Sequence, residues 1–132
     1  MLLLRYLWYV DLLVDGALSV DIQCTAERSC RFMNAFIANT STVGISCGPS
    51  YACSFSEFVI NASSVVNTVC TGQGSCYISQ FTIIADKAVF IADGGRALSQ
   101  STVNGQAMGS GFCFCPHSFF KHMLNNVFLH TD

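Results

Sequence analysis

The chain has 132 residues, of which 52% are apolar and only 11% are charged, well below the quarter or so that an ordinary soluble domain carries. Its length suits one domain with one core. Six basic and eight acidic residues give a formal charge of −2, and without a basic run this balance argues against a nucleic-acid partner. The even number of cysteines, eight, indicates an oxidising compartment.

The N-terminal segment, residues 1–19, begins MLLLRYLWYVDLLV, an apolar stretch that Arg5 and Asp11 interrupt. It is too short to cross a bilayer comfortably, so no membrane span is expected. As a secretory signal it would end with Ala17 and Ser19 at the −3 and −1 positions, but Asp11 breaks its apolar region. We favour an apolar strand or short helix that lies over the end of the core.

A repeat of 23 residues runs through the middle of the chain and is clearest in the cysteines. Two columns keep this period, the first with Cys24, Cys47 and Cys70, the second with Cys30, Cys53 and Cys76. Apolar columns keep it as well: Val20, Val43, Val66 and Val89; Ile22, Ile45, Thr68 and Ile91; Phe32, Phe55 and Ile78; Ile37, Ile60 and Ile83.

Within each repeat, apolar residues alternate with other residues, which is typical of strands with one buried face. Such a unit cannot bury its apolar face alone, so it must stack in parallel on its neighbours at about 4.8 Å. The sequence therefore predicts an all-β fold: a parallel β-helix, or β-solenoid, of about four turns over residues 20–115, followed by an apolar flank over residues 116–132. The expected core contains Val43, Ile45, Phe55, Phe58, Ile60, Val66, Ile83, Val89 and Ile91.

These columns, from Val20 to about Ala92, resemble the Cys-containing right-handed parallel β-helix repeat proteins. Residues 93–99 take the place of a fourth cysteine turn but contain no cysteine. The resemblance implies an architecture only, because the chain carries no catalytic motif specific to a family.

Pairing across each turn would use six cysteines in the same way, which predicts disulfides between Cys24 and Cys30, Cys47 and Cys53, and Cys70 and Cys76. Vertical bonds within a column are the alternative, because stacked α-carbons lie at a workable distance of about 4.8 Å. They would leave one thiol unpaired in each column. In the tail, Cys113 and Cys115 are expected to form a disulfide, either with each other or with another chain.

No metal or cofactor is expected. The C-x5-C spacing of the turns differs from the usual zinc pairs. Cys113, Cys115, His117 and His122 supply four zinc donors, but a disulfide between the two cysteines is the simpler interpretation.

No catalytic residue is predicted either. Sugar-cleaving β-helices need clustered acidic groups, whereas the suitable column here reads Asn34, Glu57 and Gln80, with one carboxylate. We interpret this column as an outward polar ladder. All three histidines lie in the tail and no G-x-S-x-G motif occurs, so a serine hydrolase is not indicated.

Two sequons begin at Asn39 and Asn61, in neighbouring turns. Together with the cysteines they favour a secreted or cell-surface protein that carries N-linked glycans.

A solenoid has two open ends, and the flanks of this one are apolar and aromatic instead of polar. We therefore expect a non-enzymatic extracellular structural protein whose partner is itself, assembled head to tail into a filament or surface layer. A carbohydrate-binding or carbohydrate-processing domain is the first alternative. An ice-binding solenoid is the second, although its threonine columns are irregular: Thr25, Gly48 and Thr71; Thr40, Ser63 and Asp86.

Overall fold

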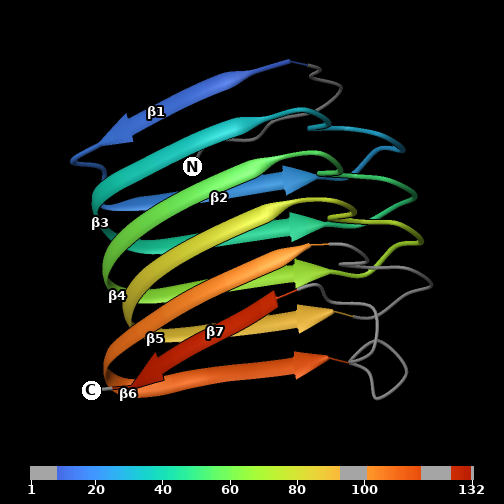
Figure 1. The fold of residues 1–132 in the computed structure, drawn as a ribbon. Helices are drawn as coiled ribbons and strands as arrows, with labels where there is room; N and C mark the ends of the chain where they lie inside the picture. The colour runs from blue at the N-terminus through green and yellow to red at the C-terminus, as the bar shows by residue number, and fades with distance from the viewer. Residues whose placement is uncertain (1–8, 93–100, 117–125, 132) are drawn as a thin grey trace.

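The computed structural model describes residues 9–92, 101–116 and 126–131, with side chains up to Asn104. These residues form one parallel sheet that coils on itself (Figure 1), which confirms the predicted β-solenoid of about four turns. Its strands are β1 (Asp11–Asp15), β2 (Ser19–Cys24), β3 (Asn34–Cys47), β4 (Glu57–Cys70), β5 (Gln80–Ala92), β6 (Thr102–Pro116) and β7 (Asn126–Thr131).

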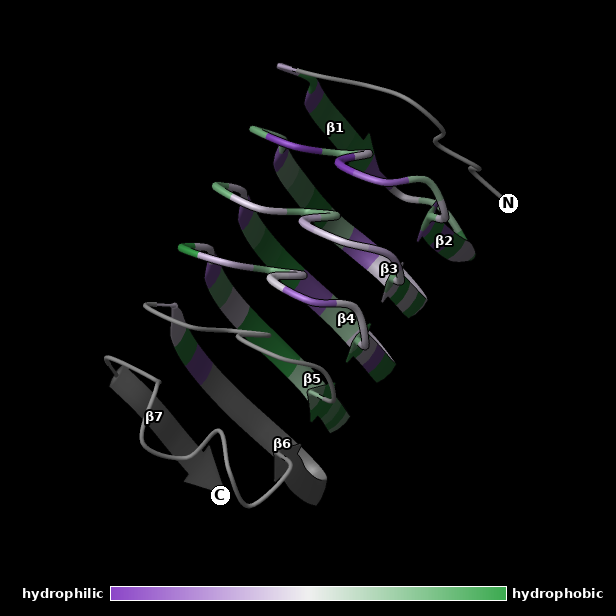
Figure 2. Cartoon of the chain, turned by 90° about the vertical axis from the view of Figure 1, so that its right-hand side faces the viewer, coloured by the Kyte–Doolittle hydropathy of each residue, from purple (hydrophilic) through white to green (hydrophobic). Residues whose placement is uncertain are grey.

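The four long strands, β3 to β6, each bend midway and contribute to two walls of the solenoid (Figure 1). Their first halves make the first wall, in the order β1-β3-β4-β5-β6-β7. Their second halves make the second wall, which begins with β2, paired with β3 from Ser19↔Thr42 to Cys24↔Cys47. The turns that connect β2 to β3, β3 to β4 and β4 to β5 lie one above another along the remaining side (Figure 2). The parallel ladder thus includes β1 and β7, outside the residues where the repeat is visible in the sequence.

The bend between the two walls is made by a local irregularity in the ladder. In β3, Asn39 adopts a positive φ of 51°, and the register shifts on both sides of Thr40. Thr40 points inward, and its hydroxyl donates to the carbonyl of Ala38 at 3.0 Å. An extra residue of this kind lets a strand bend without leaving the sheet.

The core fills the space between the walls, as the alternation of apolar residues predicts. Stacked aromatic rings contribute to it, since the rings of Phe58 and Phe81 lie parallel with centroids 5.0 Å apart. Six of the nine residues expected in the core are no more than 2% exposed: Val43, Ile45, Phe58, Ile60, Val66 and Ile83.

We count β1 and β2 as the first coil, so that β3, β4 and β5 belong to the second, third and fourth coils. The second half of β5 has a register that differs from the prediction. Asn61 pairs with Ile84, but Val65 pairs with Lys87, so the bend of β5 is one residue shorter than that of β4. A shift of one residue turns every following side chain to the opposite face.

Val89 and Ile91 were therefore wrongly assigned to the core. Val89 is only partly buried and Ile91 is 38% exposed. Ala88 and Phe90 face inward in their place, and the ring of Phe90 meets that of Phe81 edge-on at 4.9 Å.

Phe55 was also wrongly assigned to the core. It lies partly exposed at the corner after a cysteine turn, where its ring stacks on that of Phe32 with centroids 5.2 Å apart. Both residues have positive φ angles, 58° and 57°, which turn their side chains away from the alternation of an extended strand. Ile78, which follows them in the column, is 36% exposed.

Candidate functional site

Each of three successive turns is closed by a disulfide, and the pairing is the one predicted across the turns. The bonds join Cys24 to Cys30, Cys47 to Cys53, and Cys70 to Cys76, with Cα–Cα distances of 5.9, 5.9 and 6.1 Å. These bonds are consistent with an oxidising environment. The side chains of Cys113, Cys115, His117 and His122 lie outside the described part of the chain, as does any bond or metal that they hold.

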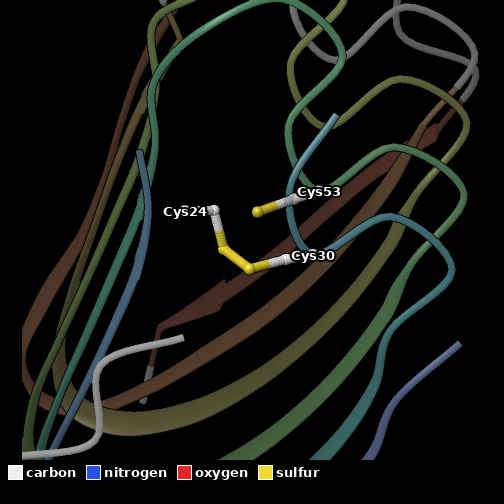
Figure 3. Close-up of side chains that lie close together, drawn as sticks. All are labelled: Cys24, Cys30 and Cys53. Atoms are coloured by element: carbon white, nitrogen blue, oxygen red, sulfur yellow. A yellow bond between two sulfur atoms is a disulfide. The ribbon is translucent and has the colours of Figure 1, made fainter. Parts of the chain in front are cut away.

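Disulfides of adjacent coils lie close together. The sulfur atoms of Cys24, Cys30 and Cys53 all lie within 4.8 Å of one another (Figure 3). Because each of these sulfurs already belongs to a disulfide, none offers the thiolate that a zinc ion needs. The cluster is therefore a structural stack and not a metal centre.

The turns also bond to each other through their backbones, in alternating directions along the stack. In the second turn, the amide of Cys53 donates to Ser29 of the preceding coil at 2.9 Å, whereas the amide of Tyr51 donates to Gln73 of the following coil at 2.8 Å. Tyr51 and Cys53 have positive φ angles of 58° and 55°. Such strained conformations persist where surrounding contacts hold them, as the disulfides and these bonds do here.

A buried ladder of serines runs along the stack of coils. Its members, Ser56, Ser79 and Ser101, directly precede the strands β4, β5 and β6. The Ser79 hydroxyl accepts from the Ser56 amide at 3.2 Å and donates to the Cys53 carbonyl at 2.7 Å, so one side chain binds two groups of the preceding coil. Ser101 does the same for the amide of Ser79 and the carbonyl of Cys76. This ladder was not predicted, although the spacing of 23 residues between Ser56 and Ser79 indicates it.

The outer face of the first wall carries an open groove of about 330 Å³ next to the first coil. One row in it is polar and the next is apolar. Asn34 donates from Nδ2 to Oδ1 of Asp11 at 3.0 Å in the polar row, while Phe36 is 51% exposed in the apolar row. The groove is lined by Asp11, Leu12, Leu13, Asn34, Ala35, Phe36, Glu57 and Val59.

The groove changes one expectation about the acidic residues. The polar column has Glu57 between Asn34 and Gln80, as predicted, but Asp11 precedes Asn34 in it. The column therefore has two carboxylates and not one, because β1 belongs to the wall. Their backbones are two strand spacings apart, about 9.6 Å, and the hydrogen bond to Asn34 engages Asp11. Carboxylates at this spacing can accept hydrogen bonds from a ligand that lies in the groove.

The first coil ends the described solenoid at an open edge. Within the described ranges, β1 and β2 pair only with β3. The inward side chains Leu12 and Val14 of β1 are only partly buried, whereas Ala35 and Ile37, their partners on β3, are 2% and 0% exposed. Apolar side chains at this end therefore remain in partial contact with water.

Both sequon asparagines are exposed near the bend between the walls. The Nδ2 group of Asn39 donates to Oδ1 of Asp15 at 2.7 Å, and a glycan on this nitrogen would leave it one N–H group. Nearby, Thr40 is only 1% exposed, so its column does not form a flat surface of threonines.

Comparison of the chain with models of protein families, with curated proteins and with solved structures yields no match. Among the described residues, no helix has the length and apolar character of a membrane span.

Proposed function

We propose that this chain is a non-enzymatic structural protein of the extracellular space or cell surface, which polymerises end to end into a filament or layer. The observation that carries the proposal is the open edge of the first coil, where Leu12 and Val14 are incompletely buried. Burying such side chains is favourable by about 25 cal/mol for each Å² removed from water, and a second solenoid stacked on this edge would bury them.

The hydrogen bonds of β1 support strand addition at this edge. The carbonyl of Val10 accepts from Asn34 at 2.8 Å, and the amide of Gly16 donates to Ala38 at 3.1 Å, so alternate residues of β1 bond to β3. By this alternation the amides of Leu13 and Asp15 point to the open edge. An extended strand from another molecule finds main-chain partners at such an edge.

The covalent features support the proposed location. Disulfides persist in secreted and surface proteins and are rare in the cytosol. Three of them fall in successive coils of this solenoid. Asn39 and Asn61, which glycans would modify, lie on the bends of the neighbouring strands β3 and β4.

A proline at Leu13 tests the use of this edge. Leu13→Pro removes an amide that faces the edge and leaves the bonds to β3 in place, whereas Leu13→Ala shortens the side chain and keeps the amide. We expect wild type and Leu13→Ala to form polymers and Leu13→Pro to sediment as a monomer. Circular dichroism and disulfide mapping should show both variants folded. Monomeric wild type at high concentration would contradict assembly, and a polymerising Leu13→Pro would contradict the use of β1.

Carbohydrate binding is the second candidate, and the groove is the observation that favours it. Its polar row offers carboxylate and amide groups to sugar hydroxyls, beside an exposed aromatic ring at Phe36 that can pack on the apolar face of a sugar. Binding of a monomeric wild-type protein to a glycan array would support this function over assembly.

A further inference from the structure

We infer that the stacked cysteine turns form a site of internal thiol–disulfide exchange. There a small external thiol converts two bonds that close turns into two bonds that join adjacent coils. This exchange is independent of the proposed assembly. Numbered in chain order, the first disulfide is Cys24–Cys30, the second is Cys47–Cys53 and the third is Cys70–Cys76.

The sulfur atoms of neighbouring turns lie close to one another. Cys53 is turned toward the first disulfide, and its sulfur and those of Cys24 and Cys30 are all within 4.8 Å of one another (Figure 3). The sulfur of Cys47 lies within 4.8 Å of both sulfurs of the third disulfide. If the second bond opens, each of its two sulfurs is therefore already beside the bond of a different neighbour.

The burial of the stack limits where a released sulfur can react. All six cysteines are 0% exposed. Among the described residues, the sulfurs closest to a released thiolate, apart from its own former partner, belong to an adjacent turn. Two groups that the fold holds side by side react faster than the same groups in solution, because no bimolecular encounter is needed.

The backbone places the cysteines where bonds between coils need them. Cys24 and Cys47 are partners in the ladder of β2 with β3, so their α-carbons lie about 4.8 Å apart. Disulfides join α-carbons that are roughly 4.4–6.8 Å apart. The next turn is held in place as well, because the amide of Cys53 donates to Ser29 of the preceding coil at 2.9 Å. A bond between Cys24 and Cys47 can therefore form without separating the strands.

Three exchanges complete the conversion and consume neither oxidant nor reductant. An external thiolate attacks Cys47 of the second bond, forms a mixed disulfide with it and releases the Cys53 thiolate. Cys53 attacks Cys30, forms the bond Cys30–Cys53 and releases the Cys24 thiolate. Cys24 attacks Cys47 of the mixed disulfide, forms the bond Cys24–Cys47 and releases the external thiolate. Each step breaks one S–S bond and makes one, so the external thiol is a catalyst.

The third disulfide can take the place of the first. The external thiolate then attacks Cys53 and releases Cys47, which lies beside the third bond. The products are the bonds Cys47–Cys70 and Cys53–Cys76, and the first bond stays closed. Either conversion uses all four sulfurs of two neighbouring turns, so no thiol is left unpaired.

The conversion changes what the disulfides hold together. A bond that closes a turn joins cysteines six residues apart within one coil. A bond between coils joins equivalent cysteines that are 23 residues apart in the chain. In the converted form, two coils that hydrogen bonds hold side by side are also linked covalently along the stack.

Wild-type protein with a trace of reduced glutathione tests the conversion. The folded chain is incubated near pH 8 with about one glutathione per hundred molecules, and N-ethylmaleimide in denaturant then stops the exchange. Trypsin cuts after Arg28 and chymotrypsin after Tyr51, so the cysteines of the first turn, and those of the second, fall on separate peptides. Mass spectrometry without reduction should find coil-joining peptides from about tenfold more molecules than the glutathione added.

Two serine variants test which neighbour each sulfur reaches. Cys47→Ser leaves Cys53 as a thiol beside the first bond, whereas Cys53→Ser leaves Cys47 as a thiol beside the third. Both variants open the same turn and keep the same number of cysteines, so each is the control for the other. In about a tenth of the molecules or more, the blocked thiol should appear in the first turn of Cys47→Ser and in the third turn of Cys53→Ser. Circular dichroism checks that both variants are folded.

A mixture of isotope-labelled and unlabelled wild-type chains shows whether the exchange is internal. Coil-joining peptides that exceed the glutathione added, with both halves from chains of one label, support the inference. Wild-type protein that keeps only its turn-closing bonds overturns it, and so do linked peptides that combine the two labels. In the folded variants, a thiol that stays in place or moves to the opposite turn overturns the assigned contacts.

Discussion

Single hydroxyl groups connect the coils of this solenoid through its interior. Ser56, Ser79 and Ser101 lie at equivalent places in successive coils, and each hydroxyl bonds to a backbone carbonyl of the preceding coil. The ladder satisfies backbone groups that the chain buries where it enters the first wall. An unsatisfied buried amide or carbonyl costs about 1–3 kcal/mol, so each rung stabilises a contact between coils.

Replacing Ser79 by alanine tests this role. Ser79→Ala leaves the buried amide of Ser56 without its acceptor and should lower the free energy of unfolding by about 1–3 kcal/mol in urea denaturation. Ser54→Ala is the matched control, because Ser54 is 0% exposed but its hydroxyl has no hydrogen-bond partner. The control should be neutral or slightly stabilising. Equal losses in both variants would contradict a role for the ladder.

The fourth coil shows how far a single residue changes a strand. The shorter bend in β5 brings Phe90 into the core and turns Ile91 outward. An ungapped alignment of the repeat aligns Ile91 with Ile45 and so places Val89 and Ile91 in the core. The register shifted by one residue places Ala88 and Phe90 there instead, and either register gives a strand with alternating apolar residues. Periodicity alone could not choose between them. The edge-on contact of Phe90 with Phe81 shows which one packs.

Alanine substitutions at these two neighbours test the register of β5. Phe90→Ala removes a fully buried ring and should lower the free energy of unfolding by about 3–5 kcal/mol. Ile91→Ala, at a residue that is 38% exposed, should cost less than about 1 kcal/mol. Thermal or urea denaturation of both variants measures the difference. A larger loss for Ile91→Ala would show that the strand follows the ungapped repeat.

For the whole molecule, the sequence was most informative where its signal repeats. The period of 23 residues predicted the solenoid and the pairing of Cys24 with Cys30 and its equivalents, because stacked coils place equivalent residues in columns. It was least informative outside the 23-residue repeat. Asp11 lies in a segment without a repeat signal, for which the sequence left a strand and a short helix open, so its pairing with β3 and its place beside Asn34 in the groove were not predicted.

The central claim is that whole solenoids stack end to end along the strand-stacking direction. Electron cryomicroscopy of polymers grown from the purified chain tests it most directly. The described part of the first wall contains six strands at about 4.8 Å, so a continued wall of these strands predicts filaments with an axial rise of about 29 Å per subunit and strands perpendicular to the axis. Monodisperse single chains at the highest attainable concentration, or filaments whose strands run along the axis, would contradict the claim.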